Sequence, residues 1–136
     1  MPDPYKVVDQ VVSALEDELS APFRLIRRPR NEPRLDLREA PDLVVLDEES
    51  GQLTLIEFRV APADDDLPFA TISEVLRLKE HNAALNPRVV LVSIARMSPV
   101  IEDALTTEDI GVIRGWSCAE VMPALRDFIA GSVAHR

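Results

Sequence analysis

The segment PDLVVLDEESGQLTLIEFRV, residues 41–60, contains the pattern that decides the fold. Residues 43–46 form a continuous apolar run, which is typical of a strand covered on both faces. Residues 47–51 predict a turn, and residues 52–60 predict the next strand. In an antiparallel hairpin with this turn, Asp42 at the start of the first strand lies near Glu57 toward the end of the second. We therefore expect two carboxylates to meet at one point of a sheet.

The chemistry of these residues favours a divalent cation. Side chains alternate between the faces of a strand, so Glu57 and Arg59 are expected on one face and Phe58 on the other. The carboxylates of Asp42 and Glu57, together with the Phe58 carbonyl, are oxygen ligands that Mg²⁺ (or Mn²⁺) accepts. A metal ion held there could polarise a phosphodiester and activate its attacking water. The pattern thus indicates a candidate metal site.

The remaining patterns predict a single α/β domain over residues 1–136, with helices on both faces of a mixed sheet. The expected elements are a helix over 3–19, a strand over 23–27, an irregular segment over 28–39, the two strands above, a helix over about 67–85, a buried strand over 88–95, a short helix from Ser98, a brief strand over 111–113, and a last helix opened by a capping box at 117–120. The order is α-β-β-β-α-β-α-β-α.

Composition narrows the class of protein further. With 136 residues and 46% apolar content, the chain is expected to fold around one hydrophobic core. No apolar run approaches the roughly 20 residues of a membrane helix, and the N-terminus lacks signal-peptide features, so we expect a cytoplasmic protein without membrane contact. Cys118 is the one cysteine and His81 and His135 are the only histidines, which argues against a disulfide or a zinc site built from these residues.

The charge is strongly acidic overall but uneven along the chain. A net charge of −9 argues against a protein whose main task is to coat nucleic acid. Residues 24–38, however, hold six arginines against two acids, a local +4 that leaves −13 for the rest. Arg24, Arg27, Arg28 and Arg30 either form a basic ridge that contacts phosphate, or belong to a solvated edge whose charges oppose aggregation.

Three further charged residues are candidates for the same site. Lys79 falls within the apolar stripe of the 67–85 helix, where an ammonium must find a partner or reach water. It either reaches the two carboxylates or extends past the rim of the core. Glu16 and Glu18 flank the apolar stripe of the first helix, and one of them could join the metal site; the alternative is an ordinary solvated acid.

Pro41-Asp42, Glu57-Phe58-Arg59 and the element order resemble the PD-(D/E)XK, or restriction-endonuclease-like, nuclease superfamily. In size and element order the chain is similar to the archaeal Holliday-junction resolvases. The resemblance covers most of the chain and implies that Asp42 and Glu57 bind metal. It also implies a lysine at the position of Arg59. Arginine stays protonated and cannot act as a base, so either Lys79 supplies the ammonium, or Arg59 neutralises the two acids in a metal-free ion pair.

Two functions follow as expectations. In the first, the protein is a Mg²⁺-dependent nuclease or nuclease subunit that cleaves DNA phosphodiesters as a homodimer. Asp42 and Glu57 then hold the metal, Lys79 or Arg59 holds the water or phosphate, and the arginines of 24–38 bind the DNA backbone. In the second, it is a catalytically inactive nuclease-fold module for protein binding or assembly in a larger complex, with a partner surface near Phe69 and Trp116.

Overall fold

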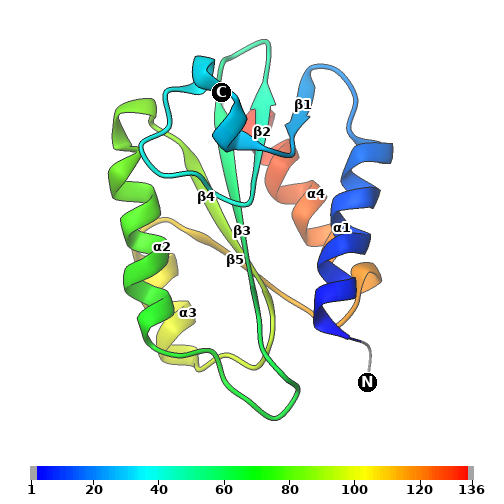
Figure 1. Ribbon diagram of the computed structural model, residues 1–136, viewed down its shortest axis with the longest axis vertical. Helices are drawn as coiled ribbons and strands as arrows, with labels where there is room; N and C mark the ends of the chain where they lie inside the picture. The colour runs from blue at the N-terminus through cyan, green and yellow to red at the C-terminus, as the bar shows by residue number, and fades with distance from the viewer. Residues whose placement is uncertain (1–2, 135–136) are drawn as a thin grey trace.

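The computed structural model describes residues 3–134, so His135 lies outside the described residues. Within them, five strands form one mixed sheet and four α-helices cover it (Figure 1). The elements are α1 (Pro4–Glu18), β1 (Phe23–Ile26), η1 (Pro29–Asn31), η2 (Pro33–Leu35), β2 (Leu43–Asp47), β3 (Leu53–Val60), α2 (Ala70–His81), η3 (Ala83–Leu85), β4 (Arg88–Ile94), α3 (Pro99–Thr107), β5 (Gly111–Arg114) and α4 (Cys118–Ala134), where η marks short 3-10 turns. This order of helices and strands confirms the predicted one. In the chain from 3 to 134, no helix combines the length and apolar character needed to cross a bilayer.

The strands follow one another across the sheet in chain order, β1-β2-β3-β4-β5. β2 and β3 pair antiparallel, as the hairpin pattern predicted, and β1 also pairs antiparallel with β2. β3, β4 and β5 pair parallel through the crossover helices α2 and α3. The β2–β3 register pairs Leu43 with Ile56. That register puts Asp42 beside Glu57.

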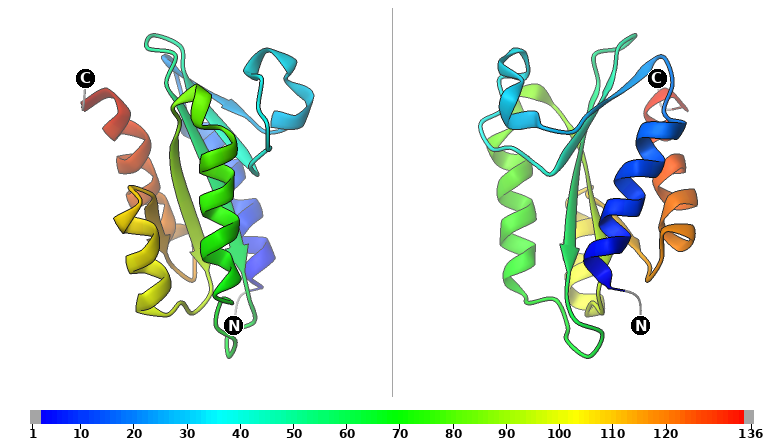
Figure 2. Two further views of the ribbon diagram at one scale, coloured as in Figure 1. Left: turned by 90° about the vertical axis from the view of Figure 1, so that its left-hand side faces the viewer. Right: turned by 45° about the vertical axis from the view of Figure 1, so that its right-hand side comes forward.

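Two apolar cores lie on opposite faces of the sheet, one under α1 and α4 and the other under α2 and α3 (Figure 2). The alternation along β3 decides which side chains enter each core. Ile56 and Phe58 pack in the α1/α4 core, and Leu55 packs in the α2/α3 core. As predicted, Glu57 and Arg59 lie on the face opposite to Phe58. They alternate in step with Leu55, so this is the face covered by α2.

The helix starts follow from their capping residues. Ser98 accepts a hydrogen bond from the Val100 amide at the start of α3, with Pro99 in the first turn. At α4, the Glu120 amide donates to the Ser117 hydroxyl at 3.2 Å, and the Glu120 carboxylate accepts from the Trp116 amide at 2.9 Å. The Ser117 half of the predicted capping box is therefore present, while Glu120 binds the amide of the residue before the N-cap.

The helix predicted over 67–85 is shorter, because its ends make other hydrogen bonds. Before α2, the Leu67 amide donates to the Arg96 carbonyl at 2.9 Å, and Asp66 bridges to Arg96, so this segment is tied to the chain that leaves β4. After α2, the buried Asn82 leaves helical geometry. Its side chain binds the segment that leads into β2.

Candidate functional site

Asp42 and Glu57 meet at the point where the backbone pairing of β2 and β3 ends. Oδ2 of Asp42 accepts a hydrogen bond from the Phe58 amide at 2.8 Å, and Oε1 of Glu57 accepts one from the Asp42 amide at 3.0 Å. Both bonds lie just beyond the Leu43–Ile56 pair. The two carboxylates therefore continue the ladder between the strands with side-chain hydrogen bonds. We call Asp42 and Glu57 the acid pair.

Arg59 lies directly against the acid pair, where a cation would be expected. Its Nη1 is 3.0 Å from Oε2 of Glu57 and donates to the Phe58 carbonyl, also at 3.0 Å. Its Nε lies 3.7 Å from Oε1 of Glu74 on α2. The guanidinium thus binds two of the three oxygen groups that were predicted to hold Mg²⁺.

The environment of Glu57 disfavours its charge. The Glu57 side chain is only 13% exposed, and burial raises its pKa to about 7. The negative charge of Asp42 and a hydrogen bond with it add to this rise, while Arg59 opposes it. Glu57 therefore exchanges a proton near neutral pH.

These residues do not fit the divalent cation that the resemblance implies. A metal ion would have to share the Glu57 carboxylate and the Phe58 carbonyl with the positive guanidinium of Arg59. Across the described part of the chain, no group of three His, Cys, Asp or Glu side chains is arranged to hold a metal ion. Within the acid pair, Glu57 already has a cation of the chain, Arg59, as its partner.

The structure does not bring Lys79 to the acid pair, so of the two placements expected for Lys79, contact with the carboxylates is wrong. Its Nζ donates to the Glu108 carbonyl, just beyond the end of α3. The fully buried residues of α2 are Thr71, Val75 and Leu78, and the buried Asn82 follows in the same line. Thr71 and Asn82 are polar, so the apolar residues of the sequence did not reveal which side of α2 is buried. Lys79 lies beside this buried line, on the side toward α3.

Glu16 and Glu18 do not join the acid pair either. Glu16 forms an ion pair with Arg27 at 2.7 Å, and Glu18 binds Arg126 of α4 through both carboxylate oxygens at 2.7 and 2.8 Å. α1 packs on the face of the sheet opposite to Glu57. That placement overturns the expectation that one of these glutamates completes a metal site.

The arginines at the start of the basic segment divide into two pairs. Arg24 lies 3.9 Å from Glu32, and Arg27 pairs with Glu16, so acids of this chain offset both. Arg28 and Arg30 are exposed and form no ion pair within the described residues. The structure thus leaves Arg28 and Arg30 as the available cations among the four candidates.

The sequence patterns missed a polar face on α2 that contacts this region. Glu74 approaches Arg59, while Arg77 and His81 both approach Oε1 of Glu39, at 3.3 and 3.2 Å. Residues 74, 77 and 81 are spaced by three and four positions, so they lie on one face of the helix. This spacing in the sequence could have predicted the polar face.

No family model matches the chain, and no curated protein matches it significantly. Among solved structures, the chain is similar to a repair endonuclease from Pyrococcus abyssi, with 15% sequence identity and a TM-score of 0.53. The match covers 82% of this chain and 46% of that endonuclease, so it spans about half the length of the neighbour. At this level of identity the likeness shows the fold. The chain therefore has a restriction-endonuclease-like fold, which confirms at the level of the fold its resemblance to the PD-(D/E)XK nucleases.

Proposed function

We propose that this chain is a nuclease-fold binding module that does not hydrolyse phosphodiesters. The observation that carries the proposal is the position of Arg59, whose guanidinium binds the Glu57 carboxylate and the Phe58 carbonyl. A guanidinium stays protonated at any physiological pH, so it neither accepts a proton from water nor leaves by losing its charge.

The surroundings favour this closed arrangement. If Arg59 moved away, the largely buried Glu57 carboxylate would lose its nearest positive charge while still facing Asp42. Without Arg59, whose charge lowers the pKa of Glu57, burial and Asp42 would raise that pKa further and favour the protonated form of Glu57, which is a poor ligand for a metal ion. Arg59 also connects β3 to Glu74 of α2, so its departure would loosen the contact between helix and sheet.

The proposed role is protein binding within a larger assembly. The net charge of −9 disfavours a role carried by nucleic-acid affinity. At the start of α2, Phe69 is 62% exposed, as suits a protein contact. In the Pyrococcus abyssi endonuclease, the matched region makes up 46% of the chain, so there the fold occurs together with further protein segments. This arrangement is compatible with a role of the fold within a larger assembly.

The competing function is metal-dependent cleavage of DNA by a homodimer. The close approach of Asp42 and Glu57 and the available cations of Arg28 and Arg30 favour it. In that case Arg59 would have to leave the acid pair before the site could work.

Cleavage and metal titration distinguish the two functions. The purified chain is incubated with plasmid, linear duplex and four-way junction DNA in Mg²⁺ or Mn²⁺, beside Asp42→Ala and Glu57→Ala. We expect no cleavage above the level of these variants. Cleavage by the wild type that both substitutions abolish would overturn the proposal.

Calorimetry with Mn²⁺ tests the role of Arg59 directly. We expect no measurable binding by the wild type and a gain of binding in Arg59→Ala, because this substitution frees the two oxygen groups. The matched control is Arg77→Ala, which removes an arginine that pairs with Glu39 outside the acid pair. Tight Mn²⁺ binding by the wild type, lost in Glu57→Gln, would contradict a site closed by Arg59.

A further inference from the structure

Exposed apolar side chains gather where α2 and α3 begin. Phe69 is 62% exposed and Val100 is 60% exposed, and each follows an exposed proline, Pro68 or Pro99. We call these four residues the apolar tip. The helices α2 and α3 cover the same face of the sheet, and both begin at the end of the molecule where β3 and β4 end (Figure 2).

The main chain holds the two halves of the apolar tip next to each other. The Leu67 amide donates to the Arg96 carbonyl at 2.9 Å, and Asp66 forms a parallel bridge with Arg96. Phe69 follows this bridge by three residues and Val100 follows it by four. The two exposed side chains therefore belong to one surface that a single partner can cover.

The segments that carry the apolar tip, residues 62–69 and 96–104, are acidic. Their charged residues are Arg96 and five acids, Asp64, Asp65, Asp66, Glu102 and Asp103. Asp66 pairs with Arg96 at 2.9 Å, and Glu102 pairs with Arg114 of β5 at 3.3 Å. Acids of this chain therefore already offset Arg96 and Arg114.

Three carboxylates at this end remain available to a partner. Asp64, Asp65 and Asp103 are exposed, and within residues 3–134 none of them forms an ion pair. Asp103 follows Val100 by three positions, so the two lie on the same side of α3. The starts of α2 and α3 contribute about half a positive charge each, which the three carboxylates exceed. An apolar surface bordered by free carboxylates complements a partner that is both apolar and cationic.

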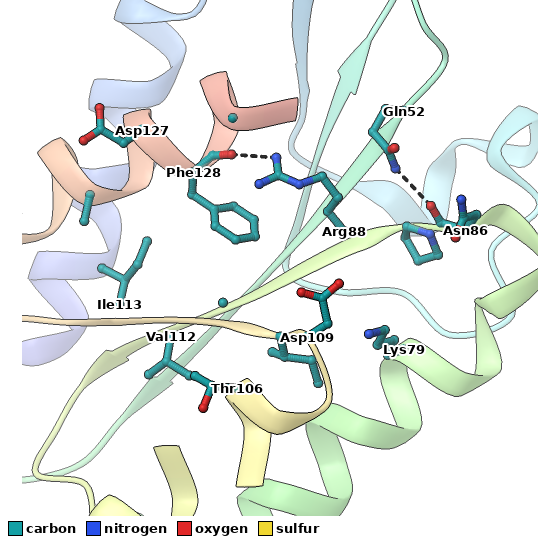
Figure 3. A pocket seen from close by; sticks show the side chains of 15 residues that line it. Gln52, Lys79, Asn86, Arg88, Thr106, Asp109, Val112, Ile113, Asp127 and Phe128 are labelled. Carbon is teal, nitrogen blue, oxygen red and sulfur yellow. Dashed lines mark hydrogen bonds between the residues drawn. The ribbon is translucent and has the colours of Figure 1, made fainter. Parts of the chain in front are cut away.

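Two other surfaces of the chain have mixed charge. Beside β5, a groove of about 950 Å³ holds Asp109 between Arg88 and Lys79 (Figure 3), and the charge of Asp109 acts on Arg88. This groove therefore selects no partner by charge. The exposed arginines of residues 28–38 are interrupted by two acids, and the whole chain carries −9, so a second copy matches the apolar tip poorly. Duplex DNA is a polyanion, which the three carboxylates repel.

We propose that the apolar tip binds a partner protein through a segment in which apolar residues stand beside lysine or arginine. The apolar residues of the partner cover Phe69 and Val100 and supply most of the affinity. Its cations lie against Asp64, Asp65 and Asp103 and set the orientation. This inference deepens the proposed function, since it rests on the chain being a binding module and names the chemistry of the partner.

The experiment selects short random peptides displayed on phage against the full chain and measures the enriched sequences as synthetic peptides by fluorescence anisotropy. We expect large apolar residues together with lysine or arginine, and an affinity that falls as the salt concentration rises. Phe69→Ser should weaken binding about tenfold or more. The matched control is Tyr5→Ser, which removes an aromatic side chain that is 68% exposed on α1 and should leave binding unchanged.

A second pair of variants tests the charge of the surface. Asp64→Asn combined with Asp65→Asn should weaken binding about threefold or more, because it neutralises two of the available carboxylates. The control, Glu48→Gln combined with Glu49→Gln, neutralises two exposed acids of the turn between β2 and β3 and should change binding less than about twofold. Both pairs change the net charge equally, and all these positions are exposed, so the variants keep the fold.

Three results would overturn the inference: no peptide is selected, the selected peptides are neutral or acidic, or the test variants and their controls have equal effects. A concentration-dependent dimer that Phe69→Ser abolishes, without peptide binding, would assign the apolar tip to a second copy and also overturn it.

DNA cleavage is measured on the same samples. Cleavage together with peptide binding at the apolar tip would refute the proposed function but leave this inference standing, whereas no cleavage and no peptide would do the reverse.

Discussion

At the scale of single residues, an arginine in place of a lysine at position 59 leaves the charge of the site the same but changes its geometry. A lysine there would present one compact ammonium, whereas the planar guanidinium contacts Glu57 and the Phe58 carbonyl through Nη1 and approaches Glu74 through Nε. These contacts hold Arg59 in place beside Glu57, the less exposed member of the acid pair. The same contacts oppose exchange of Arg59 for a metal ion.

The pH dependence of stability tests the environment of Glu57. Its pKa rises from an ordinary 4.5 to about 7, so the folded state binds this proton more tightly than the unfolded state. The resulting stability is complete below pH 4.5 and is lost as the pH rises through 7. Glu57→Gln cannot lose a proton, so its stability relative to the wild type should increase across this range by up to about 3 kcal/mol.

Urea unfolding of the wild type and Glu57→Gln at several pH values measures this difference. The matched control is Glu48→Gln, an exposed residue of the turn between β2 and β3. If the stability of Glu57→Gln follows that of the wild type at a constant offset, the charge of Glu57 is not disfavoured by folding.

At the scale of elements, the buried side chain of Asn82 holds the segment before β2 against α2. Its Oδ1 accepts from the amides of Arg38 and Glu39 at 2.9 and 3.4 Å, and its Nδ2 donates to the carbonyls of Glu39 and Leu78 at 2.8 and 2.9 Å. This segment leads directly to Asp42. The position of one acid thus depends on an amide at the end of α2.

Asn82→Ala should lower the free energy of unfolding by about 1–3 kcal/mol, because it leaves partly buried main-chain groups of Arg38 and Glu39 without partners. The amides of Arg38 and Glu39 should also exchange hydrogen faster in the folded state. Chemical denaturation and hydrogen exchange measure the two effects. Asn31→Ala, at an exposed position of η1, is the control and should change stability by less than about 0.5 kcal/mol. Equal effects of the two substitutions would show that the Asn82 bonds contribute little.

The contact between β5 and α4 gives a second prediction at this scale. A methyl group at position 111 would lie 2.4 Å from the Phe128 ring, so Gly111→Ala should destabilise the chain by about 1–3 kcal/mol through overpacking. In a Phe128→Leu background the same substitution should cost less, since the smaller side chain leaves space. Thermal unfolding of the two single variants and the double variant tests this coupling, and strictly additive losses would contradict it.

At the scale of the whole molecule, the sheet separates two cores that share its central strands. Leu15 belongs to the α1/α4 core and Leu91 to the α2/α3 core, and both are fully buried. Because β3 and β4 contribute side chains to both cores, loss of packing on one face should destabilise the other. The chain should therefore unfold in a single transition.

Leu15→Ala and Leu91→Ala should each cost about 2–5 kcal/mol. In each variant, far-UV circular dichroism and the fluorescence of Trp116, the one tryptophan of the chain, should report the same midpoint. The wild type provides the reference for both probes. Separate midpoints for the two probes in either variant would mean that the cores unfold independently.

The sequence was sufficient to predict the element order and the faces of β3, because apolar periods of two and of about 3.6 residues report directly on burial. It also placed Asp42 beside Glu57, since a short turn determines the hairpin register. It did not predict the partners of Lys79, Glu16 and Glu18. Those depend on how each helix is rotated against the sheet, and in α2 the buried polar residues Thr71 and Asn82 concealed that rotation.

The hydrogen bonds from the acid pair to the opposing backbone have an evolutionary consequence. Asp42 and Glu57 each receive an amide of the neighbouring strand, so they help to set the hairpin register. A lineage that gave up phosphodiester chemistry would still be under selection to keep both acids, because their loss would weaken folding. Persistence of this motif in a descendant chain is therefore poor evidence that catalysis persists. The residue at position 59, whose side chain makes no hydrogen bond to β2, is the better indicator.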